Sequence, residues 1–274
     1  MRKVRYAMAL AATLTVSLAA CSSGGSADEP TSGSADGSAP DSALAELQEA
    51  GVLKVGTEGT YAPYTYHDPE TDELTGYDID VITAVADELG VEPEFAETQW
   101  DAIFAGLEAE RYDIVANQVA ITEERQQKYD MSTPYTVSTG VVVTRADDTE
   151  ITSIEDVEGR TAAQSATSNW NALATEAGAQ VEAVEGLTQS IALLKQGRID
   201  LTFNDNLAVL DYLNTSGDTE IKIAFETGDS TSQGLAMRKD SGLLEAVDGA
   251  LADLRADGTL AEISQKWFGE DVTQ

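Results

Sequence analysis

The order of hydrophobic and polar residues predicts alternating strands and helices from Val52 onward. "VLKVGT" is a short apolar run typical of a buried strand, and "DIDVITAVADELG" has apolar residues at helical spacing before Gly90. A strand "EFAET", a helix "WDAIFAGLEAER" and a strand "YDIVAN" follow. The same alternation returns in residues 161–225, from "TAAQSA" through "IDLTFN" to "IKIAF". Such alternation favours an α/β fold in which helices cover both faces of mostly parallel sheets.

Two separate runs of this pattern, each about a hundred residues long, predict two α/β lobes. Between the runs lies the extended stretch "PYTVSTGVVVTRADD", and a second extended stretch, "STSQGLAMRKD", precedes a helical tail. If the tail packs on the first lobe, the chain crosses between the lobes twice, and two such crossovers form a hinge. We therefore expect one lobe to comprise residues 43–137 and 234–274, and the other to comprise residues 138–233. A single continuous sheet would give the same periodicity.

Residues 1–20 have the pattern of a bacterial secretion signal. Three basic residues precede an apolar run that is shorter than the roughly 20 residues a membrane-spanning helix needs. The run ends in "LAAC", which resembles a lipobox, so we expect cleavage before Cys21 and lipid attached to it. An ordinary signal peptide is the alternative, but Cys21 is the only cysteine and stands at the lipobox position. Residues 21–42 are rich in Ser and Gly and predict a flexible tether on the outer face of the cytoplasmic membrane.

The charge and the reactive residues exclude several classes of function. A formal net charge of −33 repels nucleic acid and anionic lipid headgroups, so we expect no nucleic-acid partner. His67 is the only histidine, and no Ser-His-Asp set with a nucleophile elbow can be assembled around it. The sequence has no His/Cys cluster at metal-ligand spacing and no glycine-rich phosphate loop. We therefore expect a protein that uses neither a metal nor a cofactor.

Three places beside predicted strand ends could hold a small charged ligand. Arg125 lies in the first helical turn after "YDIVAN", and ligands of parallel sheets bind beyond the carboxyl ends of strands. A guanidinium there can hold a carboxylate through two hydrogen bonds, although a surface ion pair with Glu123 or a neighbouring acid explains the same spacing. Asp205 stands at a strand–helix junction, where helix N-capping is the simpler role. Thr167 and Ser168 stand at another helix start, whose backbone N–H groups can receive an anion.

Several segments between Gly51 and Val272 follow a known pattern. They are "GVLKVGTEGTYAPYTY", "LTGYDIDV", "WDAIFAGLEAERYDIVANQVAITEERQQKYDMSTPYT", "LLKQGRIDLTFNDNLAVL" and "DGTLAEISQKWFG". In these segments the chain resembles the family 3 extracellular solute-binding proteins, which are the polar amino-acid receptors of ABC importers. The resemblance implies a two-lobed periplasmic-binding-protein fold that closes around one amino acid without catalysing a reaction.

The resemblance also implies roles for individual residues. Arg125 would hold the α-carboxylate of the ligand with help from Ser168, and Asp205 would accept its α-ammonium group. The aromatic walls of the pocket would be Tyr61 and Trp100. The other expected pocket positions are Glu58, Asn117, Gln118, Ala120 and Thr167. Ala120 departs from the many relatives that have Ser or Thr there, so only a backbone contact would remain. The segment "SATS" also lacks the glycine that many relatives place before the helix start.

Within the family, "NQVAITEERQQKYDMSTPYT" looks most like the cystine- and cysteine-binding subgroup, with Met131 in place of the usual Phe. Tyr61 and Trp100 suit a disulfide side chain, but they would also accept histidine or glutamine. We expect a monomeric, lipid-anchored receptor that captures L-cystine or cysteine and delivers it to an ABC permease and its ATPase. The alternatives are a ligand-binding sensor for a signalling partner and a dehydratase-type enzyme on the same scaffold.

Overall fold

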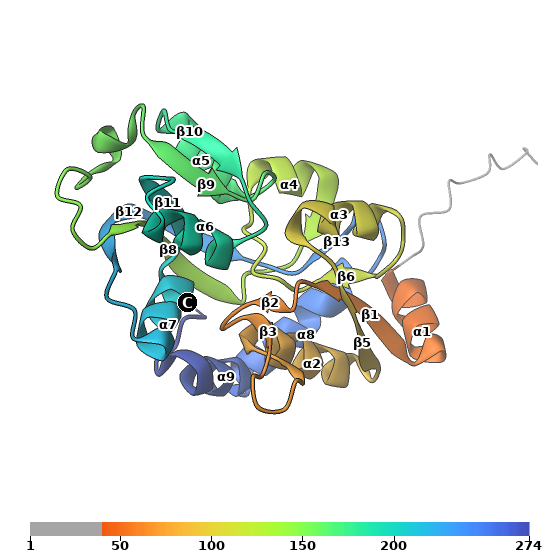
Figure 1. Cartoon of the computed structure of the whole chain (residues 1–274). Coiled ribbons are helices and arrows are strands. Elements are labelled where there is room, and N and C mark those ends of the chain that lie inside the picture. The colour runs from red at the N-terminus through yellow and green to blue at the C-terminus, as the bar shows by residue number, and fades with distance from the viewer. Residues whose placement is uncertain (1–39, 274) are drawn as a thin grey trace, which may run out of the picture. The chain divides into compact units, whose positions relative to one another are not determined.

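The computed structural model describes residues 40–273, which contain two five-stranded sheets and one small three-stranded sheet (Figure 1). The predicted signal peptide, Cys21 and most of the predicted tether lie outside the described residues. Among residues 40–273, every helix is too short or too polar to cross a bilayer.

The first sheet has the strand order β5-β1-β6-β13-β7. Its strands are β1 (Val52–Thr57), β5 (Glu92–Glu97), β6 (Ile114–Val115), β7 (Tyr129–Met131) and β13 (Ala236–Arg238). β1 pairs in parallel with β5 and β6, whereas β13 pairs antiparallel with β6 and β7. The sheet is therefore mixed, because a strand from late in the chain returns into it.

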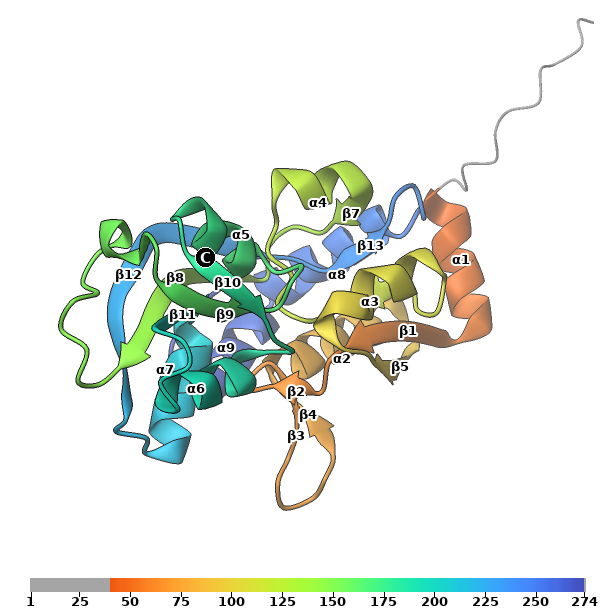
Figure 2. The ribbon, with the colours of Figure 1, turned by 45° about the horizontal axis from the view of Figure 1, so that its top comes forward.

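The second sheet has the strand order β10-β9-β11-β8-β12. Its strands are β8 (Thr136–Arg145), β9 (Thr161–Gln164), β10 (Gln180–Ala183), β11 (Leu201–Asp205) and β12 (Ile221–Gln233). β9 pairs in parallel with β10 and β11, and β8 pairs antiparallel with β11 and β12. Figures 1 and 2 show β8 and β12 side by side, and the chain continues from β12 into β13 of the first sheet.

The small sheet lies beside the first one and carries residues that reach the second. Its strands are β2 (Thr60–Tyr61), β3 (Thr65–His67) and β4 (Leu74–Thr75), in the order β2-β3-β4. The sequence pattern did not predict these short strands, because two or three residues show no hydrophobic period.

Helices cover the sheets as the hydrophobic periodicity predicts. The helices that pack against the first sheet, or against other helices next to that sheet, are α1 (Pro40–Ala50), α2 (Tyr77–Leu89), α3 (Trp100–Glu108), α8 (Leu244–Ala256) and α9 (Thr259–Phe268). Those that contact the second sheet are α5 (Asn169–Glu176), α6 (Leu187–Lys195) and α7 (Asn206–Ser216). The short α4 (Glu123–Lys128) follows β6, and a 3₁₀ turn, η1 (Ile154–Val157), follows β8. α2 ends where the sequence predicts, at Gly90, which adopts the left-handed conformation with φ 75°.

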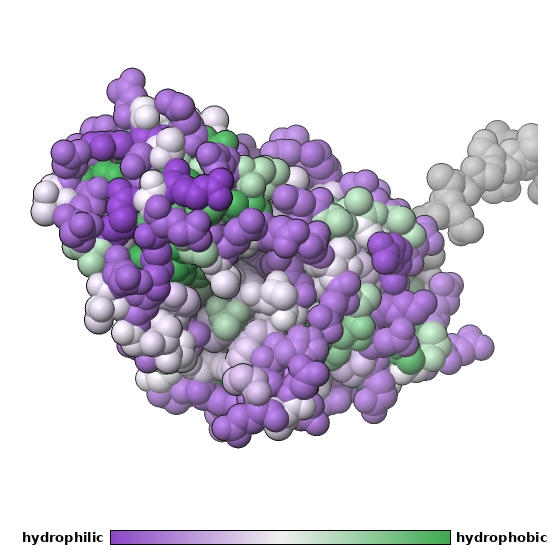
Figure 3. Space-filling view, viewed as in Figure 1, coloured by the Kyte–Doolittle hydropathy of each residue, from purple (hydrophilic) through white to green (hydrophobic). Residues whose placement is uncertain are grey.

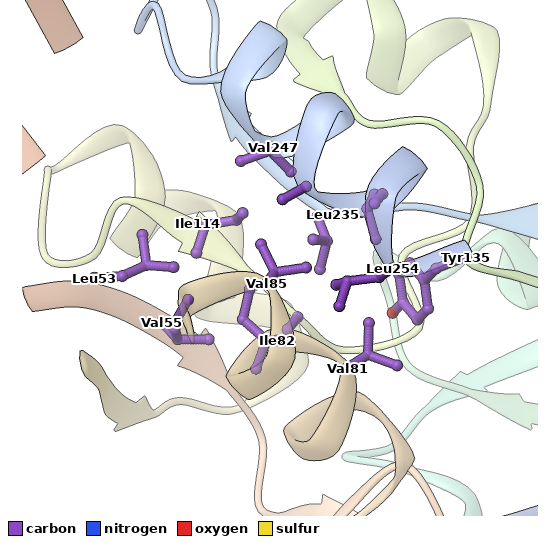
Figure 4. Close-up of a cluster of buried hydrophobic side chains, with 14 of the residues drawn as sticks. Leu53, Val55, Val81, Ile82, Val85, Ile114, Tyr135, Leu235, Val247 and Leu254 are labelled. Carbon is purple, nitrogen blue, oxygen red and sulfur yellow. The ribbon is translucent and has the colours of Figure 1, made fainter. Parts of the chain in front are cut away.

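The largest core joins the two ends of the described chain. α2 and α8 pack against each other beside the first sheet, and their apolar faces meet the side chains of β1 and β6 (Figure 4). The labelled core residues are Leu53, Val55, Val81, Ile82, Val85, Ile114, Tyr135, Leu235, Val247 and Leu254. This pairing places the helical tail beside the first sheet, near the start of the fold.

Candidate functional site

A cavity lies between the first and second sheets, beyond the ends of strands from both. Glu58 follows β1, Asn117 and Gln118 follow β6, Gln164 ends β9, and Asn204 lies in β11. Figure 3 shows a mostly hydrophilic face that is hollowed between the two lobes. This is the place where open α/β sheets bind their ligands, since several strand ends bring side chains to one crevice.

Six of the residues expected in the pocket line this cavity. They are Glu58, Tyr61, Trp100, Asn117, Gln118 and Ser168. The sequence reasoning missed other lining residues, among them Thr60, Gln164, Asn169, Trp170, Glu185, Leu187, Ser190 and Asn204. The lining residues include two acids, Glu58 and Glu185, and no Lys, Arg or His among those described. A cavity of this composition favours ligands that carry ammonium groups.

Glu58 and Asn117 form a close pair in the wall of the cavity. The Asn117 side-chain amide donates to Glu58 Oε2 at 2.6 Å, and the backbone N–H of Glu58 donates to Asn117 Oδ1 at 2.8 Å. Burial raises the pKa of Glu58 to about 7, although the hydrogen bond from Asn117 opposes that rise. The carboxyl group therefore changes charge near neutral pH, and a ligand ammonium group beside it would favour the ionised form.

Aromatic side chains from both lobes face the cavity. The Tyr61 hydroxyl donates to Asn204 Oδ1 at 2.8 Å, which joins the small sheet to β11. Trp100, the first residue of α3, is 8% exposed. Trp170 in α5 packs against Gly140 of β8, where a Cβ atom would lie 2.7 Å from the Trp170 ring. The sequence reasoning missed Trp170, because hydrophobic periodicity does not indicate whether an aromatic residue in the first turn of a helix faces the core or a cavity.

Arg125 is buried rather than on the surface. It is 8% exposed, and its guanidinium lies 5.2 Å from the centre of the Trp100 ring. Nη1 donates to the carbonyl oxygen of Ala120 at 2.9 Å, and Nη2 donates to that of Thr167 at 3.5 Å. No carboxylate within residues 40–273 forms an ion pair with Arg125, so the surface ion pair with Glu123 is wrong. Burial lowers the pKa of Arg125 to about 10.

Arg125 lines a groove beside the cavity rather than the cavity itself. That groove also includes Thr167 and Ser168, and Ser168 borders the cavity as well. The Ser168 side chain caps α5 by accepting the backbone N–H of Asn171 at 3.1 Å. Ala120 faces a third hollow on another side and pairs with Gln233 in an isolated antiparallel bridge.

Asp205 caps α7, which is the simpler role that its position suggests. Its Oδ1 accepts the backbone N–H of Leu207 at 2.9 Å and the hydroxyl of Tyr64 at 2.5 Å, and its Oδ2 accepts the hydroxyl of Ser138. Asp205 is 2% exposed and is not among the residues that line the cavity. Its neighbour Asn204 lines the cavity instead. The structure therefore does not bring Arg125 and Asp205 together in one open space.

The family model for bacterial extracellular solute-binding proteins, family 3, matches residues 53–270. The chain belongs to this family. Its fold is the two-lobed α/β periplasmic-binding-protein fold, with two mixed sheets flanked by helices. Its relatives are named as solute-binding proteins, and the chain is a binding protein rather than an enzyme. Family membership supports an amino-acid ligand and an ABC transporter as partner.

The chain is similar to the L-cystine-binding protein TcyA of Bacillus subtilis (strain 168), with 52% identity over 97% of this chain and 98% of that protein. Among solved structures, it is similar to the L-cystine solute receptor of Neisseria gonorrhoeae in its unliganded open conformation. There the identity is 45%, the TM-score is 0.57, and 84% of this chain and 98% of that chain are covered. An ancestral arginine-binding protein bound to arginine is 35% identical, with a TM-score of 0.75 over 80% of this chain and 99% of that chain.

Proposed function

We propose that this protein captures L-cystine between its two lobes and delivers it to the permease of an ABC importer. The observation that carries the proposal is the 52% identity to an L-cystine-binding protein over 97% of the chain. A shared ligand is the simplest reason for identity of this degree over the whole length of a binding protein.

The chemistry of the cavity supports a ligand of this kind. L-cystine has two ammonium groups, and the cavity lining contains Glu58 and Glu185 without a lysine or arginine. Trp100, Trp170 and Tyr61 supply aromatic surface, against which sulfur packs favourably. We propose that Arg125 and Ser168 bind one carboxylate of the ligand, at the place where the groove that holds Arg125 adjoins the cavity at Ser168. We also propose that Asp205, which is buried next to the cavity-lining Asn204, accepts the ammonium group in exchange for a hydrogen bond that Tyr64 or Ser138 now donates.

The proposal includes closure of the lobes around the ligand. The L-cystine solute receptor in its open conformation is 45% identical to this chain but has a TM-score of only 0.57. The arginine-bound ancestral protein is 35% identical, yet its TM-score is higher, at 0.75. Hydrogen bonds from Tyr61 to Asn204 and from Tyr64 to Asp205 join the small sheet to β11. Both observations support the inference that the two lobes are in a closed arrangement in this structure.

We further propose that residues 43–137 and 234–274 form one lobe and that residues 138–233 form the other. The pairing of β13 with β6 and β7 supports this division. Lipid on Cys21 would hold a monomeric receptor at the outer face of the cytoplasmic membrane. The predicted tether, residues 21–42, would end before residue 40, because Pro40 begins α1. Metabolic labelling with a palmitate analogue would test the anchor, because Cys21→Ser should remove the label.

Calorimetry of the purified protein with L-cystine, cysteine, arginine, glutamine and histidine tests the ligand. We expect L-cystine to bind at least about tenfold more tightly than the other four, since each of its two charged ends adds contacts that single amino acids lack. Equal affinity for arginine and L-cystine would contradict the proposal. Uptake of labelled L-cystine by cells with and without the gene tests the delivery to a permease.

A further inference from the structure

Gln164 and Asn204 are two amides that line the cavity, and the ligand contacts proposed above use neither of them. Gln164 ends β9, and Asn204 lies near the end of β11, which pairs with β9 in parallel. The two residues are 3% and 7% exposed. Both side chains therefore reach the cavity from the carboxyl ends of neighbouring strands, at a place that water hardly reaches.

The side chain of Asn204 has one defined orientation. Its Oδ1 accepts the backbone N–H of Asp205 at 2.9 Å and the hydroxyl of Tyr61 at 2.8 Å. Because a backbone N–H can only donate, the atom that faces it must be the amide oxygen. The amide nitrogen is left without an acceptor from residues 40–273, and it keeps some surface open to the cavity. Asn204 thus offers a hydrogen-bond donor to a ligand.

The side chain of Gln164 is oriented in the opposite sense. Its amide nitrogen donates to Thr202 Oγ1 at 3.1 Å. The Thr202 hydroxyl donates its own hydrogen to the carbonyl oxygen of Ala163 at 2.9 Å, so it can only accept from Gln164. The Gln164 side-chain oxygen has no donor in the described part of the chain, and it too keeps surface open to the cavity. Gln164 thus offers a hydrogen-bond acceptor.

The two amides lie at a different end of the cavity from Ser168. Asn204 follows Phe203 in β11, so their side chains point to opposite faces of the second sheet. Phe203 packs in the apolar cluster that contains residues of α5, the helix that Ser168 caps. Residues of α6, which borders the cavity through Ser190, belong to a separate cluster. The cavity therefore has one end at Ser168 and α5, and another at Gln164, Asn204 and α6.

Glu185 adds a negative charge at the second end. It follows β10, which pairs with β9 so that Ala183 lies opposite Gln164. Its carbonyl oxygen accepts the hydroxyl of Ser165, the residue after Gln164, at 3.2 Å. The Glu185 side chain is exposed and lines the cavity. A charged ammonium group is therefore favoured over a neutral donor at the Gln164 oxygen.

We infer that Gln164 and Asn204 bind the second half of L-cystine. The Gln164 oxygen accepts a hydrogen bond from its ammonium group, and the Asn204 amide donates to its carboxylate. The inference rests on the proposed function, in which Arg125, Ser168 and Asp205 bind the first half. L-cystine has two identical zwitterionic ends joined by a disulfide, and a cavity with two polar ends matches such a ligand. A single amino acid leaves the two amides unpaired, which costs affinity.

Three analogues of L-cystine test the second half by calorimetry on the full-length protein. S-methylthio-L-cysteine has a methyl group in place of that half. The mixed disulfide of L-cysteine with cysteamine lacks only the second carboxylate, and the mixed disulfide with mercaptopropionate lacks only the second ammonium group. In each analogue the complete cysteine half takes the end beside Arg125. We expect each mixed disulfide to bind about tenfold more weakly than L-cystine, and the methyl compound about a hundredfold more weakly.

The analogues separate this inference from the proposed function. If the protein binds L-cystine and binds S-methylthio-L-cysteine equally tightly, the inference alone is wrong. If the protein does not bind L-cystine, the proposed function has failed instead.

Asn204→Asp exchanges the free donor for an acceptor and keeps the shape of the side chain, including the oxygen that accepts from Tyr61 and Asp205. We expect the affinity for L-cystine to fall about thirtyfold or more, because two carboxylates would then meet. The affinity for the cysteamine disulfide should change less than about threefold. Asn206→Asp is the control, since it adds the same charge two residues later, where Oδ1 accepts the backbone N–H of Thr139 at 3.1 Å. It should change either affinity less than about twofold.

Gln164→Met keeps the inference testable if Asn204→Asp does not fold. It removes the acceptor for the ammonium group, so the affinity for L-cystine should fall about tenfold. The affinity for the mercaptopropionate disulfide should stay within about twofold, because that ligand has no second ammonium group. Gln180→Met, at an exposed position of β10, is the control. A merely structural role for either amide would weaken all the ligands by the same factor, and that result would overturn the inference.

Discussion

The carboxylate of Asp101 accepts both the backbone N–H and the hydroxyl of Thr167, at 2.9 and 2.8 Å. Its other oxygen accepts the backbone N–H of Ala166 at 3.2 Å. Asp101 stands in the first turn of α3, beside the first sheet, and Thr167 precedes α5, beside the second. One exposed side chain thus connects the two lobes next to the cavity.

Asp101→Ala should release the ligand faster. The three hydrogen bonds form only when α3 and the loop before α5 are close together, so their loss destabilises the closed arrangement without removing a wall of the cavity. We expect affinity to fall about fivefold to tenfold, mainly through a higher dissociation rate measured by stopped-flow fluorescence. Asp87→Ala, at an exposed position of α2, is the control. Equal dissociation rates for the two variants would contradict a role for Asp101 in closure.

Arg125→Met should make the unliganded protein more stable and abolish ligand binding. Burial removes water from the Arg125 guanidinium, two carbonyl oxygens replace that hydration only in part, and no carboxylate in residues 40–273 forms an ion pair with it. A Met of similar length avoids this loss of hydration. We expect the free energy of unfolding in urea to rise by about 1 kcal/mol, and the affinity for L-cystine to fall at least about a hundredfold.

Arg125→Lys separates charge from geometry at the same position. Lysine keeps the positive charge but lacks the planar fork that holds a carboxylate through two hydrogen bonds, so we expect it to restore little of the affinity. If Arg125→Met has a lower free energy of unfolding than the wild type and still binds L-cystine, Arg125 supports the fold instead of the ligand.

Glu58→Gln should remove part of the pH dependence of stability. Because the pKa of Glu58 is raised from 4.5 to about 7 in the folded protein, the folded state binds a proton more tightly than the unfolded state does. Its contribution is therefore fully present below pH 4.5 and is lost as the pH rises through 7, by up to about 3 kcal/mol. Urea denaturation between pH 4 and 8 should show the wild type losing stability relative to the variant. Parallel curves for the two proteins would refute the assignment.

Gly140→Ala should disturb the cavity through Trp170. A Cβ atom at this position would lie 2.7 Å from the Trp170 ring and 2.7 Å from the Thr227 hydroxyl, so both side chains would have to move. We expect a loss of about 1 to 3 kcal/mol in stability and a lower affinity for L-cystine, with a change in tryptophan fluorescence. Gly249→Ala in α8 is the control, since its Cβ would meet no atom within 4 Å. It should stabilise the protein by up to about 1 kcal/mol.

The elements of the fold were predictable because they depend on short-range patterns. The apolar spacing from Ile79 to Leu89 and the terminal Gly90 predict α2 almost to its last residue. Thr122 is the N-cap of the helix that contains Arg125, a role typical of a threonine before a first turn with two glutamates, and its hydroxyl accepts the backbone N–H of Arg125 at 3.2 Å. The small strands β2, β3 and β4 were not predicted, since they depend on pairing between segments and not on their own periodicity.

The candidate site was predictable in its residues but not in their contacts. Six expected residues line the cavity, yet the burial of Arg125 depends on rings of Trp100 and Phe104 that reach it only in the folded chain. Trp170 and Asn204 were missed because tertiary packing alone turns them toward the cavity.

The core around α2 and α8 has a consequence for biosynthesis. Val81, Ile82 and Val85 are translated long before Val247 and Leu254, which complete the same apolar cluster. While the ribosome is still adding the last quarter of the chain, the early strands lack the helix that covers them, and they cannot finish folding as a unit. The lobe that contains the first sheet therefore completes its core only when synthesis is nearly over.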